Sequence, residues 1–448
     1  MNKKIVILGA GESGVGAAIL AKKKGHQVFV SDKGNILAKY KAILEAENID
    51  FEEKQHTQTR LFAADIIIKS PGIPNHIALI KELRAKNIPV ISEIEWGSRH
   101  TTAKIVAITG SNGKTTTTSL VYHLLKSAGF NVGLAGNIGE SFAKQVAQKD
   151  FDIYVLEISS FQLDDIVGFR PNIAIITNIT ADHLDKYNYS LDEYAAAKLR
   201  ITENQTKDDF LIYNFDDKYL VQQFEKQETK AQKIPFSVQA FFEENGTFIK
   251  ENKLICKTKQ EIYEIDQNKF ALQGKHNLYN ALAALTVCNL LDVKTFDIQA
   301  FLPTFASLEH RLEKVAMIDE KTFVNDSKAT NVDSVWYAID AMTQKTIWIV
   351  GGVDKGNDYS ELYDLVKQKI KAIVCLGKDN SKIKKAFADF VPKIVEAQTA
   401  NDAVRKAFFL AEKNETILLS PACASFDLFK NYIDLSLIHI SEPTRHAS

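Results

Sequence analysis

Short apolar runs recur along the chain, and several are followed by a glycine-rich or polar turn and then by a helical pattern. Residues 3–32 read as a strand, a glycine turn, a helix and a second strand that ends at Asp32. Residues 64–74 read as a further buried strand that ends in a Ser-Pro-Gly turn. Strands that alternate with helices predict a parallel sheet with helices on its faces. We therefore expect a first α/β domain over residues 1–95.

A second α/β unit is expected at residues 96–300. Its apolar strands lie within residues 105–108, 151–163 and 171–185, and polar residues stand at the C-terminal end of each strand. In doubly wound sheets that end is where ligands bind. A strong helical pattern over residues 273–291 closes the unit.

Three apolar segments supply strands for a third α/β domain, which we expect over residues 301–434. These segments are residues 345–362, 370–378 and 415–432. The last stretch of the chain, "LSLIHISEPTRHAS" (residues 435–448), resembles the translated end of a sequencing adapter. We expect it to be a non-native tail and leave it out of the fold prediction.

Composition narrows the class of protein further. A chain of 448 residues is too long for one ordinary core and suits about three domains. The formal net charge is −1, so no basic field favours nucleic acid or an anionic membrane. Four scattered cysteines fit reduced thiols better than a disulfide framework. No apolar run approaches the ~18–20 residues of a membrane span. These features predict a cytoplasmic protein.

The strongest chemical signal is the stretch "VAITGSNGKTTTTSL", residues 106–120. Gly110 and Gly113 let backbone N–H groups face phosphate oxygens, Lys114 supplies charge, and Thr115 can bind Mg²⁺. The strict phosphate-loop pattern requires glycine at position 108, where Ile108 stands. A plain strand-to-helix turn is the alternative, but a Gly-Lys-Thr sequence after a buried strand favours nucleotide binding.

Two further strand ends carry candidate metal ligands. Glu157 ends one apolar strand and is either a second acidic contribution to Mg²⁺ binding or a buried carboxylate with other partners. His183 ends the next strand, between Asp182 and Asp185. A lone histidine is more often structural, so the residues alone leave both roles open for His183.

Other polar positions leave their alternatives open. Gly9, Gly11 and Gly14 form G-x-G-x-x-G between a strand and a helix, which can bind a dinucleotide or another nucleotide or can simply pack tightly. Asn277 and Asn280 share a helix face and can bind adenine or cap a neighbouring loop.

Three more segments complete the candidates. Lys198, on an Ala-rich helix, reads as part of a solvated face. In residues 324–334 an apolar strand is followed by alternating Asp326, Lys328 and Thr330, which in an extended segment would project the same way toward phosphate or a carboxylate. Lys355 follows a strand and two glycines, and Ser420 ends another strand.

Taken in order over residues 5–434, these motifs resemble those of the Mur ligase family. The matching motifs are "GSNGKTTTT", "GNIG", "LEISSFQL", "ITADHLDKY", "AAKLRI", "GKHNLYNALAA", "LEHRLE", "NDSKATN", "GGVDKG" and "LSPACASFD". Each motif is moderately specific, whereas their joint order and spacing are highly specific. Within the family, "SSFQL" and "SPACASFD" favour the glutamate-adding branch.

The resemblance implies three domains: an N-terminal Rossmann-like domain, a central P-loop ATPase-like domain with a parallel sheet, and a C-terminal Rossmann-like domain. The first would bind the UDP end of the substrate, so the glycines of its first motif would serve UDP rather than a dinucleotide. The central domain would hold ATP. The third would bring D-glutamate and close over the site.

The resemblance also implies roles for individual residues. Thr115 and Glu157 would hold one Mg²⁺, with His183 and a carbamylated Lys198 at a second. The catalytic set would be Lys114, Glu157, His183 and Lys198. Residues at ATP would be Gly110, Ser111, Asn112, Gly113, Lys114, Thr115, Thr116, Asn277, Arg311 and Asp326. Residues at the other substrates would be Ser13, Asp32, Ser70, Gly72, Asn137, Lys328, Thr330, Lys355, Ser420 and Phe426.

The implied reaction is ATP-dependent addition of D-glutamate to UDP-N-acetylmuramoyl-L-alanine through an acyl phosphate, with ATP and Mg²⁺ as cofactors. The implied enzyme is a cytoplasmic monomer with no nucleic-acid or membrane partner. Family members continue past residues 426–432 with a helical stretch that carries an acidic residue and an Arg-Gly pair, and residues 435–448 depart from it. We expect loss of that stretch to weaken stability and glutamate binding.

Two alternatives compete with this interpretation. One is a related amide ligase that adds a different amino acid or extends a folate with glutamate. The other is a nucleotide-binding regulatory module that uses the first glycine motif for redox sensing. Phosphate release with each candidate substrate discriminates among the three.

Overall fold

The computed structural model describes residues 2–258, 262–272, 274–306 and 309–436. Gln273 of the predicted helix, Leu308 of "LEHRLE" and residues 437–448 of the predicted tail lie outside the described residues. The chain divides into two compact units. The first consists of residues 1–179, 192–270 and 279–304, and the second of residues 180–191, 271–278 and 305–448.

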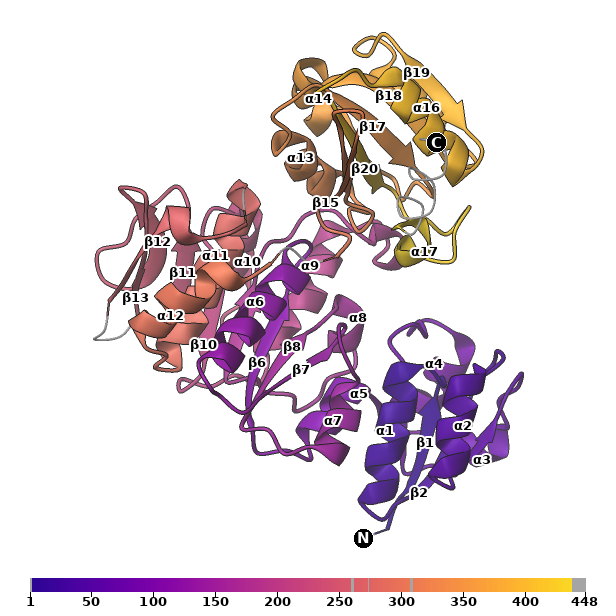
Figure 1. Ribbon diagram of the computed structural model, residues 1–448. Coiled ribbons are helices and arrows are strands. Elements are labelled where there is room, and N and C mark those ends of the chain that lie inside the picture. Colours follow the sequence, from indigo (N-terminus) through magenta and orange to yellow (C-terminus); the bar gives the residue numbers. More distant parts are fainter. Residues whose placement is uncertain (1, 259–261, 273, 307–308, 437–448) are drawn as a thin grey trace. The chain divides into compact units, whose positions relative to one another are not determined.

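The first sheet has five parallel strands in the order β3-β2-β1-β4-β5. Its strands are β1 (Lys4–Leu8), β2 (Gln27–Ser31), β3 (Asp50–Glu52), β4 (Ile66–Lys69) and β5 (Val90–Ser92). Its helices are α1 (Glu12–Lys23), α2 (Ala38–Ala46), α3 (Gln58–Phe62), α4 (Ala78–Ala85) and α5 (Glu93–Ser98). Alternate residues of β1 enter two different cores, with Ile5 and Ile7 in one and Val6 and Leu8 in the other. The sheet is therefore covered on both faces, and Figure 1 shows α1 and α2 alongside it.

The central sheet has nine strands in the order β14-β13-β12-β11-β10-β9-β6-β8-β7, and β13 alone runs antiparallel to its neighbours β12 and β14. Its strands are β6 (Lys104–Thr109), β7 (Val132–Gly136), β8 (Ile153–Glu157), β9 (Ile173–Ile176), β10 (Phe210–Asn214), β11 (Gln232–Ser237), β12 (Gly246–Lys250), β13 (Lys253–Lys257) and β14 (Tyr263–Asp266). The associated helices are α6 (Lys114–Ser127), α7 (Phe142–Gln148), α8 (Ser160–Leu163), α9 (Leu191–Leu199), α10 (Lys218–Lys226), α11 (Lys275–Leu290) and α12 (Thr295–Phe301).

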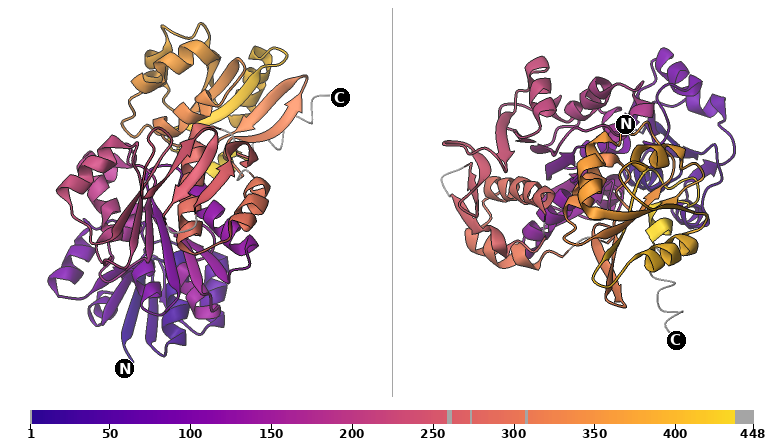
Figure 2. Two further views of the ribbon diagram at one scale, coloured as in Figure 1. Left: turned by 90° about the vertical axis from the view of Figure 1, so that its left-hand side faces the viewer. Right: turned by 90° about the horizontal axis from the view of Figure 1, so that it is seen from above.

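The third sheet has six strands in the order β15-β16-β20-β17-β18-β19, parallel except for the edge strand β15. Its strands are β15 (Glu313–Ile318), β16 (Lys321–Asn325), β17 (Thr346–Gly351), β18 (Ile370–Leu376), β19 (Ile394–Ala397) and β20 (Thr416–Ala422). Its helices are α13 (Val332–Asp340), α14 (Tyr363–Lys369), α15 (Ser381–Phe387), α16 (Ala400–Leu410) and α17 (Tyr432–Ser436). Figure 2 shows its strands side by side in orange and yellow.

The three α/β sheets confirm the predicted fold class. Strands β10 to β14 extend the central sheet beyond the strands that the apolar runs revealed. The β12–β13 hairpin turns at Glu251 and Asn252, and both residues have positive φ. Neither residue is glycine, so this turn lacks the glycine that usually marks a hairpin in a sequence. No helix of the described residues is long and apolar enough to cross a membrane.

Candidate functional site

The loop between β6 and α6 is held by side-chain hydrogen bonds with the residues that follow β9. Gly110 has a φ of +146°, and a Cβ there would lie 1.9 Å from Thr177 Oγ1, so only glycine fits. The Thr177 hydroxyl donates to the Asn112 carbonyl at 2.6 Å. Asn112 N–H in turn donates to Asn178 Oδ1 at 2.8 Å. The loop is thus fixed in one conformation by its neighbour strand.

Ile108 explains why the loop needs no glycine at that position. It lies inside β6, fully buried, and pairs in register with Glu157 on one side and Ile175 on the other. The turn therefore begins only at Gly110. The missing first glycine of the strict pattern falls within the strand, where a β-branched side chain packs well.

Helix α6 begins directly after this loop and leaves its first N–H groups to the loop side. Gly113 is its N-cap residue and offers no side chain to bond them. A helix N-terminus attracts anions, because the N–H groups of its first turn and the helix dipole point the same way. Lys114 Nζ folds back and donates to the carbonyls of Gly110 and Ser111, each at 2.8 Å. The next residues, Thr115 and Thr116, are buried on the first turn.

Lys198 corrects the prediction of a solvated helix face. Its side chain is 1% exposed, and its Nζ donates to the Gly110 carbonyl at 2.8 Å. The ammonium also lies over the ring of Tyr194, 4.4 Å from the centroid. The Ala-rich sequence of α9 hid this, because small residues beside a lysine suit a buried helix face as well as an exposed one.

Glu157 stands at the end of β8 with one oxygen in use and one orphaned. Asn137 Nδ2 donates to its Oε1 at 2.7 Å, while its Oε2 is buried without a hydrogen-bond partner in the described part of the chain. Burying a carboxylate oxygen without a hydrogen-bond partner costs free energy, and such an oxygen is a suitable ligand for a hard cation. The donor set of Glu157 and Thr115, both oxygens, suits Mg²⁺. No group of three or more His, Cys, Asp or Glu arranged to hold a metal occurs among the described residues.

The helix that carries the predicted adenine motif, α11, contacts α6. Asn280, on α11, accepts a hydrogen bond from the Thr117 hydroxyl at 3.0 Å. Asn280 is 5% exposed, and its amide therefore supports the first turn of α6.

In the first domain the structure brings the glycine turn together with Asp32 and Ser70. Asp32 Oδ2 accepts from the N–H of Ala10 at 2.7 Å, and the Ser70 hydroxyl donates to the Gly9 carbonyl at 3.3 Å. A Cβ at Gly14 would lie 1.9 Å from the Gly9 carbonyl oxygen, so α1 packs directly on the turn. The three motifs thus meet at the C-terminal ends of β1, β2 and β4.

Two further predicted residues of this domain flank that edge. Ser13 is half-buried in the first turn of α1, and Gly72 is exposed in the turn after β4. The N-cap of α1, Gly11, makes no side-chain cap. The C-terminal edge of the first sheet thus presents N–H groups, a hydroxyl and a carboxylate, as a sugar-nucleotide site would require.

In the second unit, Asp182 links two predicted residues. Its Oδ1 lies 3.0 Å from Lys355 Nζ, and both side chains are largely buried. His183 follows with a left-handed backbone, φ +53°, and its Nε2 lies 3.6 Å from Asp182 Oδ2. Asn331 Nδ2 donates to the same Oδ2 at 3.4 Å. The sequence singled out Asp182 only as a neighbour of His183, whereas the structure makes it the centre of this cluster.

Asp326 and Ser420 form a buried pair at the ends of β16 and β20. The Ser420 hydroxyl donates to Asp326 Oδ2 at 2.9 Å, and Ser420 is fully buried. Burial raises the pKa of Asp326 to about 7, although the hydrogen bond from Ser420 and the charge of Arg311 act in the opposite direction. In this structure the Ser420 hydroxyl therefore donates its hydrogen bond to Asp326.

The segment after β16 is a turn, which corrects the expected extended conformation. Ala329 N–H donates to the Asp326 carbonyl at 2.9 Å, and Thr330 N–H donates to the Lys328 carbonyl at 3.0 Å. Asp326 is buried, whereas Lys328 lies over the ring of Tyr432, 5.5 Å from its centroid. The strand pattern failed because the chain leaves the sheet at Asn325, one residue before the polar cluster.

Asn277 lies in the first turn of α11 and is 9% exposed. Its neighbour His276 packs against the ring of Tyr337, with centroids 5.4 Å apart. Burial, together with the charge of Arg311, lowers the pKa of His276 to about 4. His276 is thus a neutral imidazole beside the cation predicted to contact ATP, and the sequence analysis missed it.

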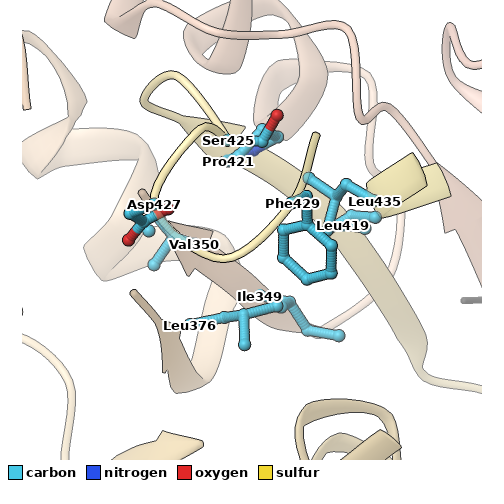
Figure 3. A pocket seen from close by; sticks show the side chains of 10 residues that line it. Ile349, Val350, Leu376, Leu419, Pro421, Ser425, Asp427, Phe429 and Leu435 are labelled. Carbon is cyan, nitrogen blue, oxygen red and sulfur yellow. The ribbon is translucent and has the colours of Figure 1, made fainter. Parts of the chain in front are cut away.

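A small pocket opens at the C-terminal ends of β17, β18 and β20. Figure 3 shows the ring of Phe429 close to Leu419 and Leu435, with the polar groups Ser425 and Asp427 at the rim. Phe426, a predicted substrate residue, is 71% exposed just after this strand end.

Family models cover most of the chain. The Mur ligase middle domain matches residues 108–288, the Mur ligase glutamate ligase domain matches residues 310–423, and the MurD N-terminal domain matches residues 4–78. The chain belongs to the Mur ligase family. Members of this family are ATP-dependent ligases in peptidoglycan precursor synthesis.

Relatives and solved structures agree with this Mur ligase assignment. The chain is 51% identical over 434 residues to UDP-N-acetylmuramoylalanine--D-glutamate ligase of Christiangramia forsetii, covering 97% of each chain. It is 52% identical over 433 residues to the enzyme of that name from Bacteroides thetaiotaomicron, covering 96% of this chain and 97% of the relative.

The fold also matches a solved Mur ligase, the UDP-N-acetylmuramate-alanine ligase MurC of Thermotoga maritima. The TM-score is 0.62 at 18% identity, with 98% of each chain covered. MurF ligase of Thermotoga maritima, solved in complex with ADP, matches with a TM-score of 0.55 at 17% identity over 80% of this chain and 85% of that chain. These likenesses confirm the three-domain fold.

Proposed function

We propose that the protein is the Mur ligase that adds D-glutamate to UDP-N-acetylmuramoyl-L-alanine. The observation that carries this proposal is the identity of about one half, along nearly the whole chain, to relatives that bear that enzyme's name. The MurC and MurF structures share the fold but not this level of identity, so the choice of amino acid rests on the sequence relatives.

The domains divide the substrates among them in this proposal. Residues 1–95 bind the sugar nucleotide, residues 96–300 bind ATP and residues 301–434 bind D-glutamate. The sugar nucleotide is contacted by Ser13, Asp32, Ser70, Gly72 and Asn137. The triphosphate and adenosine are contacted by residues 110–116 together with Asn277, Arg311 and Asp326. D-Glutamate or the reacting phosphate is received by Lys328, Thr330, Lys355, Ser420 and Phe426.

The loop and Lys114 suit the first chemical step. A carboxylate oxygen of the sugar nucleotide attacks the γ-phosphorus, and the bond from that phosphorus to the ADP oxygen breaks. Nucleophile and triphosphate are both anions, so the N-terminus of α6 and Lys114 offset their repulsion. Mg²⁺, when bound by Thr115 and Glu157, supplies further positive charge to the phosphates.

The second step joins the amino acid. The amine of D-glutamate attacks the acyl carbon, the bond from that carbon to the phosphate oxygen breaks, and inorganic phosphate leaves with the proton that the amine loses. Water must be kept from the acyl phosphate, because hydrolysis would waste it. The proposal assigns Lys198, as a carbamate, and His183 to metal binding as well.

The test is phosphate release by the purified protein. We expect release only when UDP-N-acetylmuramoyl-L-alanine, ATP, Mg²⁺ and D-glutamate are all present. Replacing D-glutamate by L-alanine, L-lysine or another candidate amino acid should abolish it. Equal release with another amino acid, or with a folate and glutamate, would show a different ligase of the superfamily. Absence of any ATP-dependent release would favour the regulatory module.

A net charge of −1 gives no reason to expect a nucleic-acid or membrane partner. We take the protein to act as a cytoplasmic monomer, which size-exclusion chromatography with light scattering tests directly.

A further inference from the structure

A buried ion pair joins the first sheet to the segment that follows α8 within the first unit. Asp165, just after α8, lies 2.9 Å from Nζ of Lys69, the last residue of β4. The two side chains are 1% and 2% exposed. Arg84 reaches the other oxygen of Asp165 at 2.7 Å from a position that is 44% exposed. One carboxylate of the central domain thus binds two cations of the first domain.

The segment that carries Asp165 is itself fixed. Ser92 N–H donates to the Asp165 carbonyl at 2.9 Å. Glu95 Oε2 accepts from the backbone N–H groups of three consecutive residues, Val167, Gly168 and Phe169, at 2.7 to 3.0 Å. The carboxylate of Asp165 therefore stands at a well-defined place for Lys69.

Lys69 uses its remaining hydrogen-bonding capacity on the turn that follows β4. Its Nζ donates to the Ile73 carbonyl at 2.6 Å, and the Ile73 N–H donates to the Ser70 carbonyl at 3.1 Å. Ser70 is tied on its other side to the glycine turn, through its hydroxyl and the Gly9 carbonyl. The Ser70–Ile73 turn is thus held from both ends, and one of these ends leads through Lys69 to the central domain.

We propose that the Lys69–Asp165 pair positions the Ser70–Ile73 turn for the sugar nucleotide, so that binding of this substrate depends on a carboxylate of the central domain. The inference rests on the proposed function, which places the sugar nucleotide at this turn. A buried ion pair gives little net stability compared with a well-packed apolar pair. An apolar pair, however, offers no hydrogen-bond donor for the Ile73 carbonyl. Placement of the turn is therefore the one effect that requires the lysine.

Three variants separate placement from stability. Lys69→Met removes the donor to Ile73 and leaves Asp165 paired with Arg84. The double variant Lys69→Met with Asp165→Leu replaces the buried pair by apolar side chains and should melt close to the parent. The control, Arg84→Met, removes the exposed cation and keeps the buried pair. Melting temperature, kcat, and KM for UDP-N-acetylmuramoyl-L-alanine and for ATP are measured for each.

We expect the single and the double variant that carry Lys69→Met to raise KM for the sugar nucleotide about tenfold, because a loosened turn loses its bound geometry, while KM for ATP stays within about twofold. The Arg84→Met control should change neither constant by more than about twofold. A double variant with parental melting temperature and parental KM for the sugar nucleotide would overturn the inference, as would an equal rise in both KM values. A parent protein without ligase activity would instead overturn the proposed function, and the inference with it.

Discussion

The Nζ of Lys198 lies 2.8 Å from the carbonyl oxygen of Gly110, and Nζ of Lys114 lies at the same distance from that same oxygen. Two cations from different helices therefore converge on the first residue of the loop. Lys114 and the N-terminus of α6 give this end of the central sheet a positive potential, which suits a polyanion.

Lys114→Ala tests whether this loop presents the triphosphate. We expect ATP-dependent phosphate release to fall by about 100-fold or more, because the variant loses the charge that faces the transferring phosphate. Initial-rate phosphate release at saturating D-glutamate measures this, with the melting temperature as the check on folding. An undiminished rate of ligation in the folded variant would remove the basis of the whole proposal.

Lys198 is predicted to be a carbamate in the working enzyme. We expect activity to decline in carbon-dioxide-free buffer and to return when bicarbonate is added, because a carbamate forms reversibly from a neutral amine. A ¹³C resonance from labelled bicarbonate should appear in the parent. Lys198→Arg provides the matched control. Arginine keeps the positive charge of an unmodified lysine but forms no stable carbamate. Full activity without carbon dioxide would contradict the assignment.

Glu157→Gln tests the orphaned oxygen. Glutamine keeps the acceptor that Asn137 uses and removes the charge from the second oxygen. We expect the Mg²⁺ concentration for half-maximal activity to rise at least about tenfold, because a neutral amide oxygen is a much weaker ligand for a hard cation. Titration of phosphate release with MgCl₂ gives this value. An unchanged titration curve would show that Glu157 does not hold the metal.

Glu93 makes the stability of the first unit depend on pH. Its Oε1 accepts from the Ser141 hydroxyl and the Ala143 N–H, both at 2.6 Å, and burial raises its pKa to about 7. Between about pH 4.5 and about pH 7, Glu93 is protonated in the folded state and ionised in the unfolded state. The contribution of Glu93 to the free energy of unfolding therefore falls as the pH rises through this range. The loss is on the order of 3 kcal/mol.

Glu93→Gln keeps the acceptor oxygen and removes the titrating proton. We expect the variant to gain stability relative to the parent as pH rises, with the two nearly equal at pH 4.5 and the variant the more stable at pH 8. Denaturant unfolding at both pH values measures the difference. A difference that is constant with pH would mean that Glu93 titrates normally.

Leu435 tests the end of the third domain. It is 2% exposed and belongs to the core that contains Ile349 and Leu419. We expect Leu435→Ala to destabilise the third domain by about 2–5 kcal/mol, because it leaves a cavity in a packed core. Thermal unfolding of the full chain measures the effect. A variant as stable as the parent would show that this residue, where the predicted non-native tail begins, adds nothing to the core.

The parts of the site that the sequence predicted share one property: their chemistry is local. The Gly-Lys-Thr turn and Glu157 lie at strand ends, so strand patterns place them without any knowledge of the tertiary fold. Lys198 and Asp182 acquire their partners from segments far along the chain, and only packing shows this. Without the family resemblance, Lys198 is indistinguishable from a surface lysine.

The turn after β16 failed for a different reason. Alternation of Asp326, Lys328 and Thr330 matches a strand, yet the hydrogen bond from Ala329 to the Asp326 carbonyl bends the backbone there. Period-two patterns in short polar segments do not discriminate between a strand and a turn.

The placement of Ile108 within β6 has a consequence for how such enzymes are detected. A scan that demands the leading glycine passes over this chain, although the remainder of its nucleotide loop is intact. A more general criterion is the point at which the preceding strand ends. Where the strand runs one or two residues longer, the leading position becomes part of the sheet and is open to any residue that packs there. Chains dismissed for lacking it are therefore worth a second inspection.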